Sequence, residues 1–322
     1  MIKAGIIGGA GYTAGELIRL LLIHPDVELE FVHSTSNAGK LISDVHTGLL
    51  GECEKAFTDK ILLDSIDVLF CCTPHGYTKE FLEHYKIPES LKIIDLSMDF
   101  RLEFEGNPFL YGLPELNRRA ICSAKYVANP GCFATAIQLG VLPMAKHLML
   151  NKELYVNAIT GSTGAGFRPT STTHFSWRDN NVSVYKAFTH RHLPEIKQSI
   201  KQLQNSFSSE INFIPYRGPF ARGIFATIVT ECKTDLVELY KIYKDYYKED
   251  SFVFVVEREI DLKEVVNTNK CLVHLEKHED KLLIVSCIDN LLKGASGQAV
   301  HNMNLMFNLE ETVGLELKSS AF

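Results

Sequence analysis

The sequence predicts an α/β protein with two domains, one a parallel sheet covered by helices and the other an α+β domain. Three observations lead to this prediction. A glycine-rich turn joins a strand pattern to an amphipathic helix near the start of the chain. Short, uniformly apolar strand patterns follow, as is typical of buried parallel strands. After Cys132 the spacing of the strand patterns changes, and 322 residues are enough for a second core.

Composition and charge exclude several kinds of partner. The formal net charge is -6 and the Lys and Arg residues are dispersed, so we expect no nucleic acid and no membrane partner. No apolar run approaches the roughly 18 residues that span a bilayer. A strand pattern begins within a few residues of Met1, and we therefore expect a cytoplasmic, unprocessed protein. The eight cysteines contain no C-x-x-C pair, so neither a disulfide framework nor a metal site is predicted.

The first glycine-rich turn has the context of a dinucleotide site. A strand is expected over Lys3–Ile7, the turn runs from Gly8 through Gly11, and an amphipathic helix follows. Such a turn lets backbone N–H groups approach a pyrophosphate at a helix N-terminus. We therefore predict a Rossmann-type domain in which Gly8, Gly11, Tyr12 and Thr13 bind the cofactor, with a purely structural tight turn as the alternative.

The residues after the second strand favour NADP over NAD. A strand is expected over Glu28–His33, and it is followed by Ser34 and Ser36 in place of the acidic residue that binds a free ribose 2′-hydroxyl. Hydroxyl groups and the nearby Lys40 are able to bind a 2′-phosphate, which a carboxylate would repel. The cofactor is therefore predicted to be NADPH/NADP.

Two further buried strands are expected over Asp67–Cys72 and Lys92–Leu96. His75 and Arg101 follow their carboxyl ends, where an open α/β sheet binds its ligands. Arg101 is a candidate for holding a phosphate or carboxylate, and a structural salt bridge is the alternative. For His75 the alternatives are the cofactor cleft and an ordinary loop histidine.

The remainder of the chain predicts an α+β domain followed by a terminal helix. Strands with antiparallel spacing are expected over Leu154–Thr160, Ile211–Tyr216, Gly223–Cys232, Phe252–Val256, Cys271–Leu275 and Leu282–Ile288. The glycine-rich segment 161–166 is predicted to bind an anion through its backbone N–H groups, with a flexible loop as the alternative. Small residues before the last helix indicate close packing. We expect this helix to return to the first domain, so the predicted domains are 1–131 with 290–322, and 132–289.

Cys132 is the candidate nucleophile. Pro130 and Gly131 are turn residues and a helical pattern follows from Phe133, so the cysteine is expected at a helix N-terminus. The backbone N–H groups and dipole at that position favour a thiolate. The alternative is a small buried residue at a helix start.

The densest cluster of ionisable groups lies over 185–196, before an amphipathic helix. His190 and His192 are two residues apart, so on an extended segment they face the same side. One of them is then able to reach Cys132 while the other meets a substrate anion. Metal ligation by this pair is the competing interpretation, but no third ligand is suitably spaced.

Together these motifs resemble the N-acetyl-gamma-glutamyl-phosphate reductase family, within the semialdehyde dehydrogenase superfamily. The resemblance extends over essentially the whole chain. The matching blocks are Gly8–Glu16, Ser36–Lys40, Asp95–Arg101, Tyr111–Glu115, Asn129–Cys132, Gly161–Gly166, His190–Ile196 and Asn290–Ala295.

The resemblance implies an NADPH-dependent reductase that acts on a small acyl phosphate and releases inorganic phosphate. It implies that Cys132 is the nucleophile that forms a thioester and that His192 is its base or ion-pair partner. It also assigns roles to other matching residues. His190, Glu195, Arg101 and Ser162 are expected at the substrate, and Gly164 and Asn290 near the cofactor.

The family pattern further implies a homodimer or homotetramer. One departure concerns the phosphate turn, where relatives commonly have a third glycine but this chain has Ala14 followed by Gly15. Because that position serves helix–strand packing, the departure affects packing and not the cofactor.

Several substrates and one different function stay open. Aspartate-semialdehyde dehydrogenase shares the cysteine chemistry, but the His-Arg-His-x-Pro-Glu block favours the glutamyl or aminoadipyl branch. An N-succinyl-glutamyl phosphate would need only a wider pocket than the N-acetyl substrate. From a different class, the chain could be a catalytically silent NADP-binding sensor.

Overall fold

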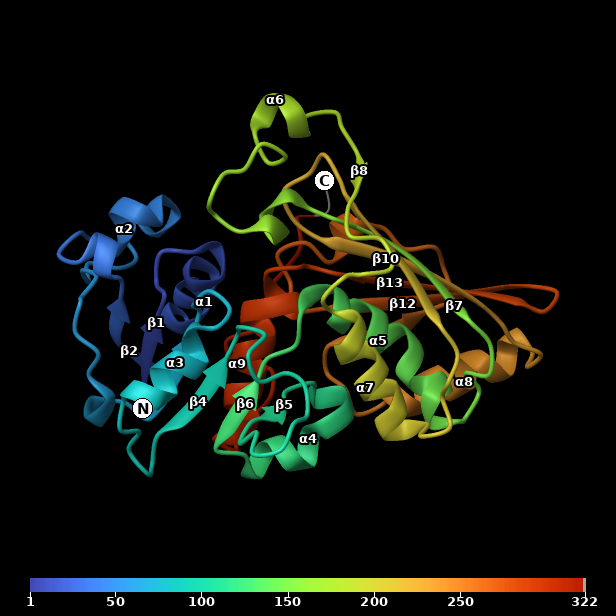
Figure 1. Cartoon of the computed structure of the whole chain (residues 1–322), viewed down its shortest axis with the longest axis horizontal. Coiled ribbons are helices and arrows are strands. Elements are labelled where there is room, and N and C mark those ends of the chain that lie inside the picture. Colours follow the sequence, from blue (N-terminus) through green and yellow to red (C-terminus); the bar gives the residue numbers. More distant parts are fainter. Residues whose placement is uncertain (321–322) are drawn as a thin grey trace. The chain divides into compact units, whose positions relative to one another are not determined.

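The computed structural model describes residues 1–320, and these form two compact units. The first unit comprises residues 1–130 and 295–316, and the second comprises residues 131–294 with the terminal segment from Leu317. The boundaries predicted from the sequence lie at 131 and 289. Each unit is described by itself below, and Figure 1 labels its elements.

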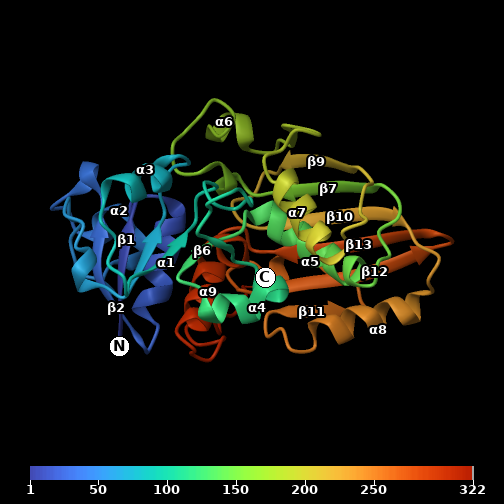
Figure 2. The same ribbon diagram turned by 60° about the horizontal axis from the view of Figure 1, so that its bottom comes forward.

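The first unit contains a six-stranded sheet in which every neighbouring pair is parallel. The predicted parallel sheet is therefore confirmed, and Figure 2 shows its strands. In order across the sheet they are β2 (Val27–His33), β1 (Ile2–Ile7), β3 (Val68–Cys71), β4 (Lys92–Asp95), β6 (Tyr126–Ala128) and β5 (Leu110–Tyr111). The two outermost strands on one side, β6 and β5, were not predicted, because two or three residues carry too little pattern to be recognised.

Helices cover this sheet, and one of them comes from the C-terminal part of the chain. They are α1 (Tyr12–Leu22), α2 (Ile42–Val45), α3 (Tyr77–His84), α4 (Pro114–Ser123) and α9 (Gly297–Met306). All ten residues of α9 are buried, and the helix contacts α1, α4 and β4 (Figure 1). The π-helical turn Leu292–Ser296 leads into it.

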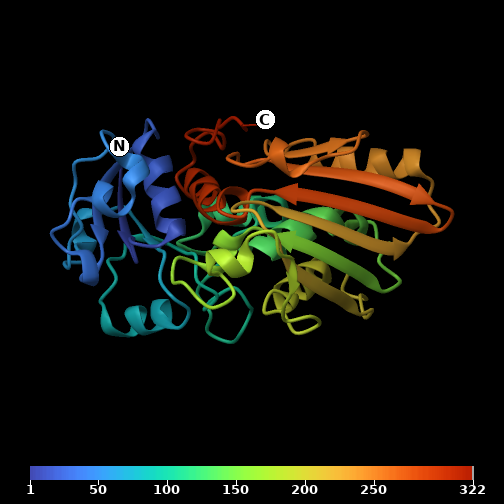
Figure 3. The ribbon, with the colours of Figure 1, turned by 90° about the horizontal axis from the view of Figure 1, so that it is seen from above.

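The second unit contains a seven-stranded mixed sheet, visible in Figure 3. In order its strands are β11 (Val253–Val256), β12 (Cys271–His278), β13 (Lys281–Ile288), β10 (Ile224–Glu231), β7 (Leu154–Thr160), β9 (Ile211–Arg217) and β8 (Ser183–Val184). The prediction of wholly antiparallel strands is wrong for two pairs, β7 with β9 and β11 with β12, which are parallel. Both pairs are joined by connections long enough for a crossover, which parallel strands require.

Helices α5 (Cys132–Lys146), α7 (Leu193–Leu203) and α8 (Leu236–Tyr247) accompany this sheet (Figure 2), and the short α6 (Phe175–Arg178) lies in the segment before β8. Helix α5 approaches the sheet closely because it carries Gly140, where an added Cβ would lie 2.8 Å from Ile228 Cδ1 on β10. Two tyrosine hydroxyls of α8 donate to α5 carbonyls, Tyr243 to Gly140 at 2.7 Å and Tyr247 to Leu139 at 2.5 Å. These bonds tie α5 and α8 together.

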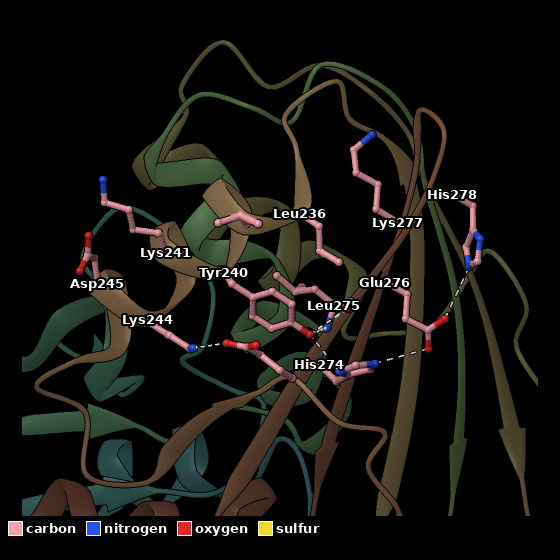
Figure 4. Close-up of a pocket in the computed structure, with 12 residues that line it drawn as sticks. Leu236, Tyr240, Lys241, Lys244, Asp245, His274, Leu275, Glu276, Lys277 and His278 are labelled. Atoms are coloured by element: carbon pink, nitrogen blue, oxygen red, sulfur yellow. Dashed lines mark hydrogen bonds and ion pairs between the residues drawn. The ribbon is translucent and has the colours of Figure 1, made fainter.

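A cavity of about 690 Å³ lies between α8 and β12. Figure 4 shows the Tyr240 hydroxyl directed at His274, with Glu276 between His274 and His278. Among the described residues that line it there is no residue predicted for the active site. The groups at its floor bond to one another, so we interpret this network as structural.

Candidate active site

Cys132 is the first residue of α5, as the sequence predicts. Its N-cap Gly131 has extended angles (φ -74°, ψ 148°), so the chain turns into the helix at the cysteine. The Thr135 hydroxyl and N–H both donate to the Gly131 carbonyl, at 3.1 and 2.8 Å, and hold this turn. The N–H groups and the positive end of the dipole at this position favour a thiolate.

Glu195 links the start of α5 to the start of α7. Its side chain lies in the first turn of α7 and the residue is only 2% exposed. Oε2 accepts the Gly131 N–H at 3.0 Å, and Oε1 lies 4.0 Å from His192 Nε2. Gln138 on α5 also donates to the Glu195 carbonyl at 3.1 Å. One carboxylate therefore touches both the backbone before Cys132 and an imidazole.

The segment that carries the two histidines is a turn and not the predicted extended segment. The Leu193 N–H donates to the His190 carbonyl at 3.0 Å, and His192 has helical angles (φ -84°, ψ -11°). The prediction is wrong because α7 begins at Leu193, with Pro194 in its first turn, so the chain must bend before it. The turn nevertheless brings the two imidazoles together edge to face, with centroids 4.7 Å apart.

His190 is neutral at physiological pH. It is 6% exposed and packs against the ring of Phe133 at 5.4 Å between centroids. Burial lowers its pKa to about 4, and the positive charges of Arg191 and Lys186 act in the same direction. The His192 N–H donates to His190 Nδ1 at 3.3 Å, so the neutral ring carries its proton on Nε2. His190 is thus arranged as a neutral hydrogen-bond donor.

The segment before α9 packs directly on Cys132. An added Cβ at Gly294 would lie 2.8 Å from Cys132 Cβ, and the Gly294 N–H donates to the Asp289 carbonyl at 2.9 Å. The buried Asp289 carboxylate receives Nε and Nη2 of Arg222 at 3.0 and 3.1 Å. The small residues here predicted close packing, but nothing in the pattern indicated that Cys132 is the neighbour.

The glycine-rich segment 161–166 forms a 3₁₀ turn over Ser162–Ala165. The predicted anion site of free backbone N–H groups needs correction. The N–H groups of Ser162, Thr163, Gly164 and Gly166 donate to carbonyls of the chain. The Ser162 and Thr163 N–H groups bond to the carbonyls of residues 220–221, and those of Gly164 and Gly166 bond within the turn. Side chains such as the Ser162 hydroxyl are therefore its candidate ligand groups.

Asn290 ties this glycine-rich loop to β10. Its Oδ1 accepts the Gly223 N–H at 2.7 Å, and its Nδ2 donates to Thr163 Oγ1 at 3.0 Å. Gly164 lies beside it, since an added Cβ there would be 3.9 Å from Asn290 Nδ2. The cofactor contacts expected of Asn290 and Gly164 stay predictions.

Two residues that the sequence did not single out belong to this neighbourhood. Tyr185 lies edge-on to His190, with centroids 5.8 Å apart, and the Arg217 guanidinium lies 4.7 Å from the centre of the Tyr185 ring. Burial raises the pKa of Tyr185 to about 12, and the Cys132 charge adds to the effect. The only sign of Arg217 in the sequence is an arginine at the end of a predicted strand, and that pattern is too common to indicate a site.

In the first unit, the glycines of the first turn have separate roles. Gly8 has φ +78°, and an added Cβ would lie 2.6 Å from the Cys72 carbonyl oxygen. Gly11 is the N-cap of α1, and an added Cβ there would meet no described atom within 4 Å. The first turn of α1, with Tyr12 and Thr13, contains no acidic residue. The turn therefore leaves an open, donor-rich helix start of the kind that binds a pyrophosphate.

Gly15 explains the departure from the usual glycine spacing. An added Cβ at Gly15 would lie 2.6 Å from Nδ1 of His46, whose Nε2 bonds to the Gly9 carbonyl at 2.7 Å. Ala14 is fully buried. The close packing at this turn is thus made with a histidine from α2's end, and Gly15 makes room for it.

The hydroxyls after β2 lie around one amide. Asn37 Nδ2 donates to Ser34 Oγ and to Ser36 Oγ, each at 3.2 Å, and Lys40 Nζ donates to Asn37 Oδ1 at 3.4 Å. The predicted groups for a 2′-phosphate are therefore neighbours, and no carboxylate takes part in these bonds.

Arg101 and His75 are held by the backbone of the first unit. Arg101 is 6% exposed, with Nε donating to the Asn129 carbonyl at 2.8 Å and Nη2 to the Leu96 carbonyl at 2.9 Å. His75 Nδ1 accepts the Met98 N–H at 3.1 Å. These bonds support the structural alternative for Arg101, and its contact with substrate stays a prediction.

Residues 1–320 contain no group of three or more His, Cys, Asp or Glu side chains placed to hold a metal ion. Within the same residues, no helix is both long enough and apolar enough to cross a membrane.

Comparison with known families first defines the class. Residues 3–124 match the model of the semialdehyde dehydrogenase NAD binding domain, and residues 132–290 match that of the semialdehyde dehydrogenase dimerisation domain. Solved aspartate-semialdehyde dehydrogenases share the fold. Type II from Vibrio cholerae has a TM-score of 0.72 at 14% identity, covering 96% of this chain and 98% of that one. The Candida albicans enzyme has a TM-score of 0.69 at 13% identity, covering 95% and 98%.

Closer relatives define the family within this class. N-acetyl-gamma-glutamyl-phosphate reductases of Phocaeicola vulgatus and Bacteroides fragilis are 71% and 72% identical over 322 residues, which is the full length of both chains in each comparison. The chain belongs to the N-acetyl-gamma-glutamyl-phosphate reductase family. The resemblance inferred from the motifs is thereby confirmed.

Proposed function

We propose that this protein reduces N-acetyl-gamma-glutamyl phosphate to N-acetylglutamate 5-semialdehyde with NADPH and releases inorganic phosphate. The family consists of oxidoreductases, and its first domain is a nucleotide-binding domain. The observation that carries the proposal is the geometry at Cys132. A thiol at a helix start is joined through Glu195 to a histidine, which is the arrangement that acyl transfer through a thioester requires.

In the proposed reaction the Cys132 thiolate attacks the acyl carbon and phosphate leaves. The addition creates an oxyanion, which needs hydrogen-bond donors in place beforehand. The N–H groups at the start of α5 are candidates, and so is Nε2–H of His190, which is neutral and has its other nitrogen occupied. A neutral donor serves an oxyanion without forming an ion pair with the incoming phosphate.

His192 is the proposed proton carrier. Its Nε2 lies 4.0 Å from the Glu195 carboxylate, which orients the ring and stabilises an imidazolium. His190 is a poor proton carrier at neutral pH, because burial lowers its pKa to about 4. The structure thus favours separate roles, with proton transfer for His192 and hydrogen bonding for His190.

The first unit has the features that NADPH requires. Gly8, Gly11, Tyr12 and Thr13 would hold the pyrophosphate at the start of α1, where an open helix terminus awaits an anion. Ser34 and Ser36, gathered around Asn37, would hold the 2′-phosphate. When bound, the cofactor supplies the hydride that reduces the acyl group.

The test is phosphate-dependent NADP reduction in the reverse direction. N-acetyl-, N-succinyl- and unacylated glutamate semialdehyde are compared side by side, and the N-acetyl substrate is expected to have the highest kcat/KM. Cys132→Ser should bind NADPH and lose turnover, whereas Cys122→Ser, a half-buried cysteine of α4, should keep both. No activity with any aldehyde would refute the proposed function, and it would favour an NADP-binding protein without catalysis.

We further propose a cytoplasmic homo-oligomer that associates through the second unit. One face of its sheet leaves apolar side chains partly or fully exposed on adjacent strands, among them Tyr155, Ile159, Ile214, Phe225 and Val229. Such a patch suits a second copy of the chain. The description of the matched model as a dimerisation domain supports the choice.

A further inference from the structure

Arg217 ends β9, where its neighbour in register on the parallel strand β7 is Thr160. Paired residues of adjacent strands face the same side of a sheet. Along β7 and β9 buried residues alternate with more exposed ones, and Thr160 and Arg217 are in register with the buried set. The Thr160 hydroxyl and Arg217 Nε are both buried, and neither has a hydrogen-bond partner among residues 1–320. Two buried polar atoms without hydrogen-bond partners thus lie at the carboxyl ends of neighbouring strands, and Thr160 immediately precedes the glycine-rich loop.

The Arg217 side chain makes fewer bonds to the chain than that of nearby Arg178. Arg178 donates to the carbonyls of Thr172, Asn181 and Arg217 and to the Ser183 hydroxyl, and its role is structural. Arg217 lies over the ring of Tyr185 and also interacts with it through a side-chain hydrogen bond, and no ion pair to a carboxylate of the described chain involves it. A half-buried arginine whose Nε is fully buried and has no carboxylate partner suits an anion supplied from outside.

The surroundings of Arg217 are positive and adjoin the nucleophile. Tyr185 contacts both the Arg217 guanidinium, at 4.7 Å, and the His190 ring, at 5.8 Å. Arg191 and Lys186 add positive charge, as shown by their lowering of the His190 pKa. Cys132 is close enough to Tyr185 for its charge to raise the pKa of the tyrosine, after the larger effect of burial.

We propose that Arg217 binds the α-carboxylate of the acyl substrate. The inference rests on the proposed function and adds to it the residue that selects an acidic substrate. The planar guanidinium fork matches the two oxygens of a carboxylate, and the Tyr185 ring 4.7 Å away limits the freedom of this arginine. Tyr185 separates Arg217 from His190, so the arginine meets the end of the substrate that is remote from the acyl carbon.

The reverse reaction distinguishes the two anions that Arg217 could bind, because the semialdehyde and phosphate are then separate substrates. In Arg217→Gln we expect the KM for N-acetylglutamate semialdehyde to rise about 10- to 100-fold, the range for a lost charge-assisted pair. The KM for phosphate should stay within about threefold of wild type by the same reasoning. A rise in the phosphate KM alone would overturn the proposal and assign Arg217 to the phosphoryl group.

A substrate without the carboxylate supplies the control. 4-Acetamidobutanal is the same aldehyde lacking that group, so wild type and Arg217→Gln should use it equally poorly. Equal losses on both aldehydes would overturn the proposal. Arg178→Gln should lower the activity with both aldehydes by the same factor, because the bonds of Arg178 are structural. Thermal melting checks folding, and Arg217→Lys, which keeps the charge, should show the same preference in weaker form. If none of the tested aldehydes supports NADP reduction by the wild-type protein, the proposed function itself fails.

Discussion

Replacing Gly294 by alanine should impair Cys132, the proposed nucleophile, although glycine has no reactive side chain. The added Cβ would lie 2.8 Å from Cys132 Cβ and 3.2 Å from Cys132 Cα. Carbon atoms in contact prefer about 3.5–4.0 Å, so the overlap is close to 1 Å. Both colliding atoms belong to the first residue of α5, which cannot rotate away. Either Cys132 or the 289–294 segment must therefore move.

The size of the effect follows from this overlap. A displacement of about 1 Å at a reacting group lowers the rate by about 10²-fold. Overpacking a tight contact destabilises a protein by about 1–3 kcal/mol. The Gly294 N–H bond to Asp289 and the Arg222 pair resist movement of the turn, so we expect much of the displacement to fall on Cys132. Turnover should fall much more than stability.

The assay is kcat in phosphate-dependent NADP reduction, together with thermal melting and NADPH titration. Gly294→Ala should lose about 10- to 100-fold in kcat and keep NADPH binding in the first unit. Tm should fall by several degrees, since about 1 kcal/mol corresponds to about 2–4 °C in a domain of about 150–250 residues. Gly48→Ala is the control, because its Cβ would meet no described atom within 4 Å. A kcat within twofold of wild type would refute the reasoning.

Three further predictions concern other parts of the molecule. Because burial lowers the His190 pKa from 6.5 to about 4, the unfolded chain takes up this proton first, and stability should fall as the pH drops through that window. The full pKa change corresponds to about 3 kcal/mol and solvent screening reduces it, so His190→Gln should remove about 2–3 kcal/mol of that pH dependence in melting curves. An unchanged profile would contradict this prediction. Gly15→Ala should displace the His46 ring and weaken NADPH binding about tenfold, as measured by fluorescence titration. An unchanged affinity for NADPH would contradict the packing argument. Val229→Glu on the exposed sheet face should dissociate the oligomer in sedimentation runs, and an oligomer of unchanged size would exclude this face.

The elements that the sequence predicted well are those whose pattern is local. The start of α5 at Cys132 follows from two turn residues and an apolar helical run. The strands β1, β2, β3 and β4 follow from short apolar runs, and their parallel order follows from the helices between them. In each case one stretch of chain contains the whole signal.

Strand direction in the second unit could not be predicted in the same way. Spacing along the chain shows where strands begin, but direction depends on which strand becomes the neighbour. Apart from the two-residue β8, β9 is the next strand after β7 in the chain, and the two strands are neighbours in the sheet. They are parallel because the chain crosses over through α7. The long segment between them gave no pattern that required this crossover.

The site depends on contacts that no single segment records. Family resemblance named Glu195, but only the structure shows one oxygen on the Gly131 N–H and the other near His192. This carboxylate is buried between the starts of two helices, where the positive ends of both dipoles stabilise its charge. The same negative charge opposes a thiolate at the neighbouring residue. Lys186 and Arg191, whose positive charges act on His190, have the opposite sign and offset that opposition. The charge of Glu195 and the charges of these two residues should therefore change the reactivity of Cys132 in opposite directions.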